Sequence, residues 1–237
     1  TSSGEGVDVD IGRAFSFVFE DANWVKKILI GGLISLVPLL GGMVTYSYML
    51  EIVRRAYEGS GDELPEWDDF GGYLLRGLIL FAALVIWFLP VIVLLGCVVG
   101  LRIAAADTSD NDGVAVISSL VLFGVVSVLI LVIVVWSVVF LPILAGRYAV
   151  ERRFGALFEF GEIWSEVRRA GAVPLLLLFV TYLAASMIGQ LGIIACFIGV
   201  IFTAFYSNLV IAHGAGQVYR RARSLGEPAA PTSAPAF

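Results

Sequence analysis

Glu51 and His213 are the ionisable residues whose positions beside long apolar runs first suggest chemistry. Glu51 precedes Arg54 and Arg55 by three and four residues, which is the spacing of ion pairs on one face of a helix. His213 is the single histidine, and one histidine without a nucleophile near it builds neither a metal site nor a catalytic pair. We therefore expect a local ion pair at Glu51 and an interfacial side chain at His213. No catalytic residue, cofactor site or metal site is predicted.

Uncharged polar residues form a second set of candidates. Thr45 and Tyr46 lie in the first long apolar segment, and Tyr206 and Asn208 lie in the last one. If the segments pack around a shared axis, these four side chains would line a polar seam that a small solute could follow. The simpler interpretation is a set of hydrogen bonds between helices, each worth about 0.6–2 kcal/mol, that stabilise the packing.

The composition indicates that these candidate residues belong to a membrane protein. Of the 237 residues, 59% are hydrophobic and 15% are charged, whereas about a quarter of a soluble domain is charged. Residues 78–101, 113–146 and 170–212 carry no charged side chain, and each run reaches the ~20 apolar residues that cross a bilayer. The sequence predicts an all-α integral membrane protein whose partner is the lipid bilayer, and it gives no basis for binding nucleic acid.

Four full spans are predicted, and the basic residues orient them. The spans cover about residues 74–101, 114–144, 173–188 and 193–212, and the turn 189–192 joins the last two. Arginines are frequent between residues 147 and 169 and after residue 219, whereas the loop 102–113 holds one arginine and three aspartates. Because Lys and Arg favour the cytoplasmic side, we expect a multi-pass protein of the cell membrane. The loop 102–113 would lie outside, and both termini would lie in the cytoplasm.

The segment 28–53, between Lys26-Lys27 and Arg54-Arg55, allows two interpretations. As one helix it would span the membrane once and place the two lysines outside, against the same rule. As a short helical hairpin, broken at Pro38 and Gly41-Gly42, it would keep both ends in the cytoplasm, with arms of about 15 residues or ~23 Å. We favour the hairpin, and one kinked span is the alternative.

An internal repeat connects these segments. The stretch 14–27, AFSFVFEDANWVKK, aligns without a gap to 156–169, ALFEFGEIWSEVRR, and each stretch runs into an apolar segment. We therefore divide residues 10–224, a single transmembrane domain, into three degenerate repeats at about 10–61, 62–153 and 154–224. Each repeat begins with an amphipathic segment that carries a tryptophan and ends with an arginine pair. These residues are Trp24, Trp67 and Trp164, and Arg54, Arg55, Arg152, Arg153, Arg220 and Arg221.

The repeat predicts a bundle of about six helices arranged as three hairpins, each preceded by an amphipathic segment in the membrane interface. Tryptophan favours the headgroup layer, so the three tryptophans would lie there. In the middle segment, LPEWDDFGGYLLRGL, Pro65 would open a short helix or turn, and Gly71-Gly72 would let the chain bend into the span. A plain hydrophilic loop is the alternative for this segment.

The remaining features carry weaker indications. A polar tail occupies residues 1–9, and a Pro/Ala-rich tail at 225–237 is expected to be disordered. Cys97 and Cys196 lie inside apolar runs and are interpreted as buried small side chains. Gly96 and Gly100 have the spacing that permits close helix approach, within the chain or between chains. Acids outnumber bases 20 to 15 and only two bases are lysines, which suits a salt-adapted organism or a genome rich in arginine codons.

Three stretches together resemble a known family: WVKKILIGGLISLVPLLGG, the arginine pair of EIVRRAYEG, and LPEWDDFGGYLLRGL. They look like the uncharacterised multi-pass membrane family catalogued as domain of unknown function four-zero-one-three. The resemblance covers about residues 10–221 and is weakest in the second half. It implies an archaeal or bacterial membrane protein, and it supplies no activity, ligand or catalytic residue.

Without a chemical constellation, we expect a non-catalytic membrane protein: a structural, accessory or assembly subunit of a membrane complex. The partners expected for the chain are other membrane proteins or, in a homo-oligomer, further copies of itself, and a homo-oligomer would favour transport. A repeat-built transporter or channel for a small neutral solute is the alternative, because repeats often place sites at their interfaces. An enzyme acting on lipid is the third class. A transporter would lose flux when Thr45, Tyr46 or Asn208 is changed, whereas a scaffold would require the tryptophan-bearing segments.

Overall fold

The computed structural model describes residues 9–60, 63–108, 112–191 and 198–226. Within these ranges the chain is helical and contains no strand, which confirms the all-α prediction. Five predicted features lie wholly or partly outside the described residues: the tail at 1–9, the loop 102–113, Cys196 with the turn 189–192, the start of the fourth span, and the tail at 225–237.

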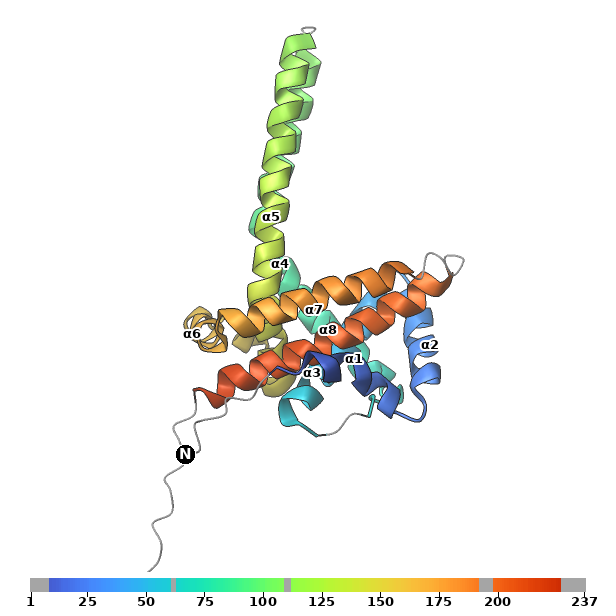
Figure 1. Ribbon diagram of the computed structural model, residues 1–237. Coiled ribbons are helices and arrows are strands. Elements are labelled where there is room, and N and C mark those ends of the chain that lie inside the picture. Colours follow the sequence, from blue (N-terminus) through green and yellow to red (C-terminus); the bar gives the residue numbers. More distant parts are fainter. Residues whose placement is uncertain (1–8, 61–62, 109–111, 192–197, 227–237) are drawn as a thin grey trace, which may run out of the picture. The chain divides into compact units, whose positions relative to one another are not determined.

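The described residues form eight α-helices and two short 3₁₀-helices (Figure 1). In chain order they are α1 (Ile11–Ser16), η1 (Phe17–Glu20), α2 (Trp24–Ser35), α3 (Leu40–Glu58), α4 (Phe70–Thr108), α5 (Asp112–Glu151), η2 (Phe154–Phe158), α6 (Phe160–Ala170), α7 (Ala172–Leu191) and α8 (Ile198–Ser224). The predicted bundle of about six helices in three hairpins is not confirmed, since the described residues form eight α-helices, of which three are long and apolar.

The chain divides into two compact units. The first, here called the helical core, comprises residues 1–80 and 138–237. The second, here called the apolar hairpin, comprises residues 81–137. The long helices α4 and α5 contribute residues to both units.

In the apolar hairpin, aromatic contacts join α4 and α5. The ring of Trp136 lies 5.2 Å from that of Trp87 and 5.0 Å from that of Phe88, measured between ring centroids. The hydroxyl groups of Ser127 and Ser137 donate to carbonyls four residues earlier in α5, at 2.8 and 2.7 Å. Their polar atoms are thus satisfied within the helix, as an apolar environment requires.

Three helices of the described chain are long and apolar enough to cross a membrane. They cover Phe70–Ala104, Val116–Glu151 and Ala172–Gln190, and they correspond to the predicted spans 74–101, 114–144 and 173–188. The predicted fourth span, 193–212, begins in residues outside the described ranges. Its remainder belongs to α8, which is not among the three.

Helix α8 is the centre of the helical core. It contacts α1, α2, α3, α6 and α7, and its residues 212–219 are buried without interruption. The sequence of that stretch, AHGAGQVY, is rich in small residues, which let neighbouring helices approach on several sides. The helix continues to Ser224, well beyond the predicted end of the span at residue 212, so Arg220 and Arg221 lie on the same helix.

The segment 28–53 forms two helices rather than one. Helix α2 ends at Ser35 and α3 begins at Leu40, with Pro38 in the break, where Leu39 has a φ of 64°. Proline disfavours the helical conformation in the residue before it, so a helix ends at or before that point. The predicted break at Pro38 is therefore present, whereas Gly41 and Gly42 lie in the first turn of α3.

The predicted bend at Gly71-Gly72 is wrong, because both glycines lie inside the first turn of α4. The chain turns before Phe70. The Asp69 carboxylate accepts a hydrogen bond from the Gly72 N–H at 2.9 Å, which is the geometry of a residue capping a helix amino terminus.

The close approach of α8 to α3 gives the first testable prediction. A Cβ atom on Gly216 would lie 2.5 Å from the Val53 carbonyl oxygen and 2.6 Å from the Ala56 Cβ. Gly216→Ala should therefore overpack the core by about 1–3 kcal/mol and lower the midpoint of thermal unfolding in mild detergent by roughly 2–12 °C.

Gly42→Ala is the matched control, because no described atom lies within 4 Å of a Cβ added there. This variant should keep or slightly raise the midpoint, since alanine favours the helix. Equal midpoints for the two variants would contradict the close packing of α8 on α3.

Candidate functional site

The described part of the helical core holds two clusters of ionisable side chains, each built around a buried cation. The first, here called the lysine cluster, consists of Asp21, Lys27 and Glu66 around the backbone of Leu64. Asp21 and Lys27 are buried, whereas the Glu66 side chain is 66% exposed. The Lys27 ammonium, in a residue only 4% exposed, donates to Asp21 Oδ2 and to the Leu64 carbonyl, both at 2.7 Å. It also lies 2.6 Å from Glu66 Oε1. Asp21 in turn accepts from the Leu64 N–H at 2.9 Å, so the ion pair satisfies both polar backbone groups of Leu64.

Local sequence explains how the Asp21 carboxylate is positioned. Asp21 follows η1, and its Oδ1 accepts from the Asn23 N–H at 2.6 Å, a turn that aspartate side chains commonly form. Helix α2 begins at Trp24, which places Lys27 in the first turn of α2. The turn thus points the acid toward a cation six residues later.

Aromatic side chains hold the linker 63–69, which connects α3 to α4. The Trp67 ring stacks on the Tyr48 ring of α3, with centroids 4.1 Å apart, and its indole N–H donates to the Lys27 carbonyl at 3.2 Å. The Tyr48 hydroxyl donates to the Pro65 carbonyl at 2.9 Å. The LPEW sequence is therefore a packed connection between helices, and not a plain hydrophilic loop.

The surroundings of Asp21 and Lys27 keep both side chains charged. Burial alone would raise the pKa of Asp21, but hydrogen bonds from Lys27 and from the Asn23 and Leu64 N–H groups outweigh it and hold that pKa below its ordinary value. Burial alone would lower the pKa of Lys27, but the hydrogen bonds to Asp21 and Glu66 raise it above its ordinary value. The pair therefore acts as an ion pair and not as an acid and a base.

The second cluster, here called the arginine cluster, is built around Arg147 of α5, which is 2% exposed. Its Nη1 lies 3.0 Å from Glu166 Oε1 of α6, its Nη2 donates to Glu159, and its Nε donates to the Ala156 carbonyl at 3.1 Å. Arg223 of α8 completes the cluster, with its Nε 3.2 Å from Glu166 Oε1. One carboxylate therefore joins three helices.

Glu166 is the group of this cluster with the most unusual environment. It is 1% exposed, and its Oε2 is buried without a hydrogen-bond partner among the described residues. Burial raises the pKa of Glu166 above its ordinary value, although Arg147 and Arg223 act in the opposite direction.

Arginines from two of the three predicted arginine pairs contact the same carboxylate, that of Glu51. Glu51 of α3 lies 2.6 Å from Arg54 and 3.9 Å from Arg55, which confirms the local ion pair. It also lies 2.9 Å from Arg152, which is 101 residues away in the sequence. Arg153 pairs instead with Glu151 and Glu159.

The third pair, on α8, lies near the first. A Cβ atom on Gly59, which caps α3, would lie 2.9 Å from Arg220 Nη1. Arg220 is exposed and Arg221 is half-buried. The carboxyl-terminal end of α8 therefore lies beside that of α3. Arg152, which follows the last residue of α5, contacts α3 as well, through Glu51.

The four residues of the predicted polar seam do not share a hydrogen-bond network among the described contacts. Thr45 donates to Gly41 of its own helix at 2.9 Å, and Tyr206 donates to the Phe15 carbonyl at 2.8 Å. Tyr46 and Asn208 are exposed. The seam stays a prediction, while the bond from Tyr206 joins α8 to α1 as the simpler interpretation expects.

The three predicted interfacial tryptophans lie in different environments. Trp164 of α6 is 49% exposed, with the Arg168 guanidinium 5.6 Å from its ring centroid. Trp24 is half-buried, and its ring meets that of Phe19 edge-on at 5.0 Å. Trp67 is half-buried in the stack described above.

His213 is not the interfacial side chain that the sequence suggested. It is 6% exposed in the buried stretch of α8, and its ring stacks on Phe17 with centroids 4.3 Å apart. Among the residues that the structure describes, no group of three or more His, Cys, Asp or Glu could hold a metal ion.

The sequence alone does not single out the residues of either cluster. In the sequence, Lys27 is one of a basic pair, and Arg147 is one of several arginines that set the topology. One available signal was the charge at the edge of a long apolar run, since a buried charge requires a partner. The identity of that partner, however, depends on contacts between distant segments.

The comparisons with known proteins identify a family and no activity. The family model described as "Protein of unknown function (DUF4013)" matches residues 30–205, about three quarters of the chain. The chain belongs to this family. No curated protein and no solved structure matches it. The matched range includes the linker 63–69 and Arg147, whereas Asp21, Lys27 and Arg223 lie outside it.

Removing Lys27 from this DUF4013 protein should strongly destabilise it. Lys27→Met leaves the Asp21 carboxylate buried without its cation and the Leu64 carbonyl without a donor, a loss of about 3–5 kcal/mol. The thermal midpoint in detergent should fall by roughly 6–20 °C. Lys26→Met is the control, since Lys26 is exposed, and its midpoint should stay within about 2 °C of the unchanged protein.

A double variant tests the pairing itself. Asp21→Asn together with Lys27→Met removes both charges, so its loss should be clearly smaller than the sum of the two single losses. Additive losses would show that the two side chains are not coupled.

Acid should remove the contribution of Asp21. Because the pKa of Asp21 is below its ordinary value, its stabilisation is present above the ordinary carboxylate range and is lost as the pH falls through the lowered pKa. The midpoint gap between the unchanged protein and Asp21→Asn should be wide at pH 7 and should close below about pH 4. A gap that stays constant from pH 7 to pH 3 would exclude this ion pair.

Proposed function

We propose that this protein is a non-catalytic structural, accessory or assembly subunit of a membrane complex. The observation that carries the proposal is the surface of the apolar hairpin. In the most apolar stretches of α4 and α5, only 11% and 17% of the residues are buried. Most residues of these stretches are therefore left at least partly open to lipid or to the helices of a partner.

The dimensions of the apolar hairpin support a membrane location. Residues 81–101 and 113–137 contain no charged side chain. At 1.5 Å per helical residue these stretches are about 32 and 37 Å long, close to the ~30 Å hydrocarbon core of a bilayer. We place the hairpin across the cell membrane, with the loop 102–113 outside and both termini in the cytoplasm, since arginines gather between residues 147 and 169 and after residue 219.

Small residues on the hairpin favour a protein partner over lipid alone. No described atom lies within 4 Å of a Cβ added at Gly96 or Gly100. Their spacing permits close helix approach, and the described part of the hairpin does not use it. A transmembrane helix of a partner would fill this face.

The ionisable groups of the helical core support a non-catalytic role. Asp21, Lys27 and Arg147 are buried and engaged with carboxylates, cations or the backbone, and Glu166 is engaged through its Oε1 atom. Charges held in this way stabilise the packing of helices, and they leave few free groups for acid–base catalysis.

Helix α6 supports the expectation that amphipathic segments lie in the membrane interface. Phe160 and Trp164 are 62% and 49% exposed one turn apart, and Arg168 follows one turn later. Ile163, Val167 and Ala170 face the core. Exposed aromatic rings beside a cation suit the headgroup layer. We retain the three-repeat organisation of residues 10–224 as part of this proposal.

A transporter for a small neutral solute is the second candidate. It would need a polar path, for which Thr45, Tyr46, Tyr206 and Asn208 were the sequence candidates. The bonds of Thr45 and Tyr206 within the core give this candidate less support. Flux of neutral solutes into vesicles, lost in a Tyr46→Phe/Asn208→Ala variant with normal expression, would favour it.

Cys97 provides the direct test of the subunit proposal. The prediction that Cys97 is buried is wrong, because its side chain is exposed on the apolar hairpin. Since it is adjacent to Gly96, a photo-crosslinker attached to it would report what lies against this face. The experiment uses the full chain with Cys196→Ala, in native membranes, followed by gentle extraction and determination of particle mass. We expect one crosslinked partner chain in constant ratio and a particle larger than one 25.5 kDa chain.

A pair of variants tests the specificity of this contact. Gly96→Leu with Gly100→Leu should reduce the crosslink at least tenfold. Gly124→Leu, also in open space on the hairpin, should not. Lipid-only adducts with a monomer, or adducts only to a second copy, would overturn the subunit proposal and favour transport.

A further inference from the structure

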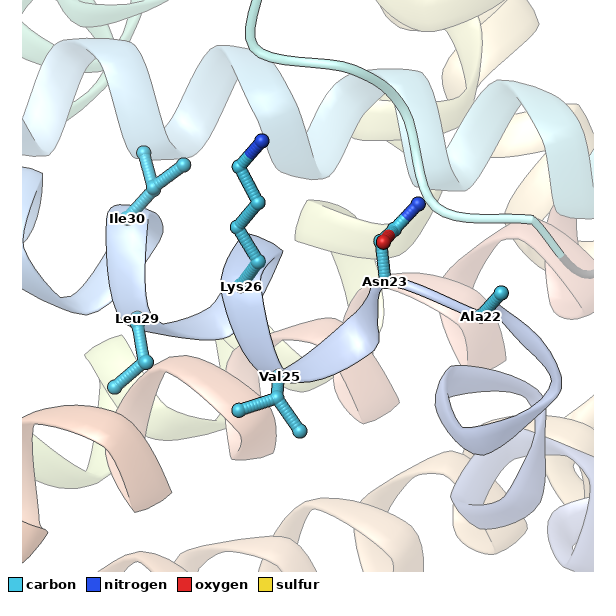
Figure 2. Close-up of a pocket in the computed structure, with 6 residues that line it drawn as sticks. All are labelled: Ala22, Asn23, Val25, Lys26, Leu29 and Ile30. Carbon is cyan, nitrogen blue, oxygen red and sulfur yellow. The ribbon is translucent and has the colours of Figure 1, made fainter.

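Helix α2 carries a concavity that the proposed function does not use. It is shallow and open, and it is lined by Ala22, Asn23, Val25, Lys26, Leu29 and Ile30 (Figure 2). Figure 2 shows Asn23, Lys26 and Ile30 extending to one side of α2 and Val25 and Leu29 to the other. A cation and apolar side chains thus lie on neighbouring faces of one helix.

Lys26 differs from most cations of the helical core. It is exposed and forms no ion pair with a described residue, whereas the adjacent Lys27 is buried and fully engaged. Arginines with a carboxylate within ion-pair distance include Arg54, Arg55, Arg76, Arg147, Arg152, Arg153, Arg169 and Arg223. The ammonium of Lys26 is therefore available to an anion from outside the protein.

An apolar stripe runs from the concavity along α2. Val25, Leu29 and Leu33 follow one another at intervals of four residues and are 50%, 46% and 65% exposed, and Leu36 continues the stripe at 53%. From Lys26 to Leu36 the helical rise is about 15 Å, which is half of the ~30 Å hydrocarbon core and so the depth of one leaflet. The cation stands at one end of this stripe, and the break at Pro38 follows the other.

We infer that this face of α2 binds an anionic phospholipid. The Lys26 ammonium binds the headgroup phosphate, the Asn23 amide provides a second donor, and one acyl chain lies along Val25, Leu29 and Leu33. A free phosphate would explain the cation but not the leaflet-length apolar stripe beside it. The inference rests on the expected short membrane hairpin of residues 28–53 and on the proposed membrane location of the protein, and it does not depend on a protein partner.

The test measures lipid binding to the purified full chain in mild detergent by native mass spectrometry. Phosphatidylglycerol and phosphatidylcholine with the same acyl chains are compared. We expect Lys26→Gln to weaken phosphatidylglycerol binding about fivefold, the effect of one lysine near a membrane surface, and to leave phosphatidylcholine unchanged. Arg153→Gln is the control, because it removes the same charge from an exposed but ion-paired position and should have little effect.

A second variant tests the apolar part of the site. Leu29→Asn keeps the cation and should weaken phosphatidylglycerol with long acyl chains more than phosphatidylglycerol with short ones. Millimolar inorganic phosphate should not displace the lipid. Both results together would assign the site to a lipid and not to a free anion.

Three outcomes would overturn the inference: equal losses for Lys26→Gln and Arg153→Gln, no preference for phosphatidylglycerol, or displacement by inorganic phosphate. A fourth is a crosslink from residue 26 to a protein partner, which would assign the face to that protein. Particle mass, measured on the same samples, reports the subunit proposal separately, so failure of one can be distinguished from failure of the other.

Discussion

The segments that connect helices in the core contain carbonyl groups buried away from water, and each of these groups needs a donor. Two buried cations provide donors at such places. Lys27 donates to the Leu64 carbonyl in the linker 63–69, and Arg147 donates to the Ala156 carbonyl in η2. Each cation is in turn neutralised by a carboxylate, Asp21 in one case and Glu166 in the other. Each of these two segments is thereby tied to a buried cation of a helix.

The same constraint explains why α8 lies at the centre. A helix surrounded by other helices satisfies its own backbone, so it can be buried along its length provided that its side chains are small or have partners. Gly216 meets the α3 backbone, His213 stacks on Phe17, and Gln217 donates to the Asp10 carbonyl at 3.1 Å. Arg223, near its end, reaches the carboxylate that Arg147 also uses. Packing and ion pairing thus converge on one element.

Patterns within one helix were predictable from the sequence, and contacts between distant segments were not. The charge-free runs predicted α4, α5 and α7, Pro38 predicted the break before α3, and the spacing of Glu51 and Arg54 predicted their pairing. The burial of Lys27 beside an exposed Lys26 was not predictable, because the two adjacent lysines differ only in which side of α2 faces the linker 63–69. The burial of α8 beyond residue 212 was missed because its closing arginines resemble the end of a membrane span.

Basic residues of this chain have two different roles, one in membrane insertion and one in the folded protein. Orientation in the membrane is set by Lys and Arg near the ends of apolar segments while the chain inserts. In the folded protein, Lys27, Arg147 and Arg223 are neutralised by carboxylates, so they present little charge to lipid. Lys26 and Arg168 do not pair with a described carboxylate, and both lie beside exposed apolar or aromatic side chains. The distribution of Lys and Arg along the sequence thus predicts the membrane topology. Which of these cations can bind a lipid headgroup depends on the ion pairs of the folded protein.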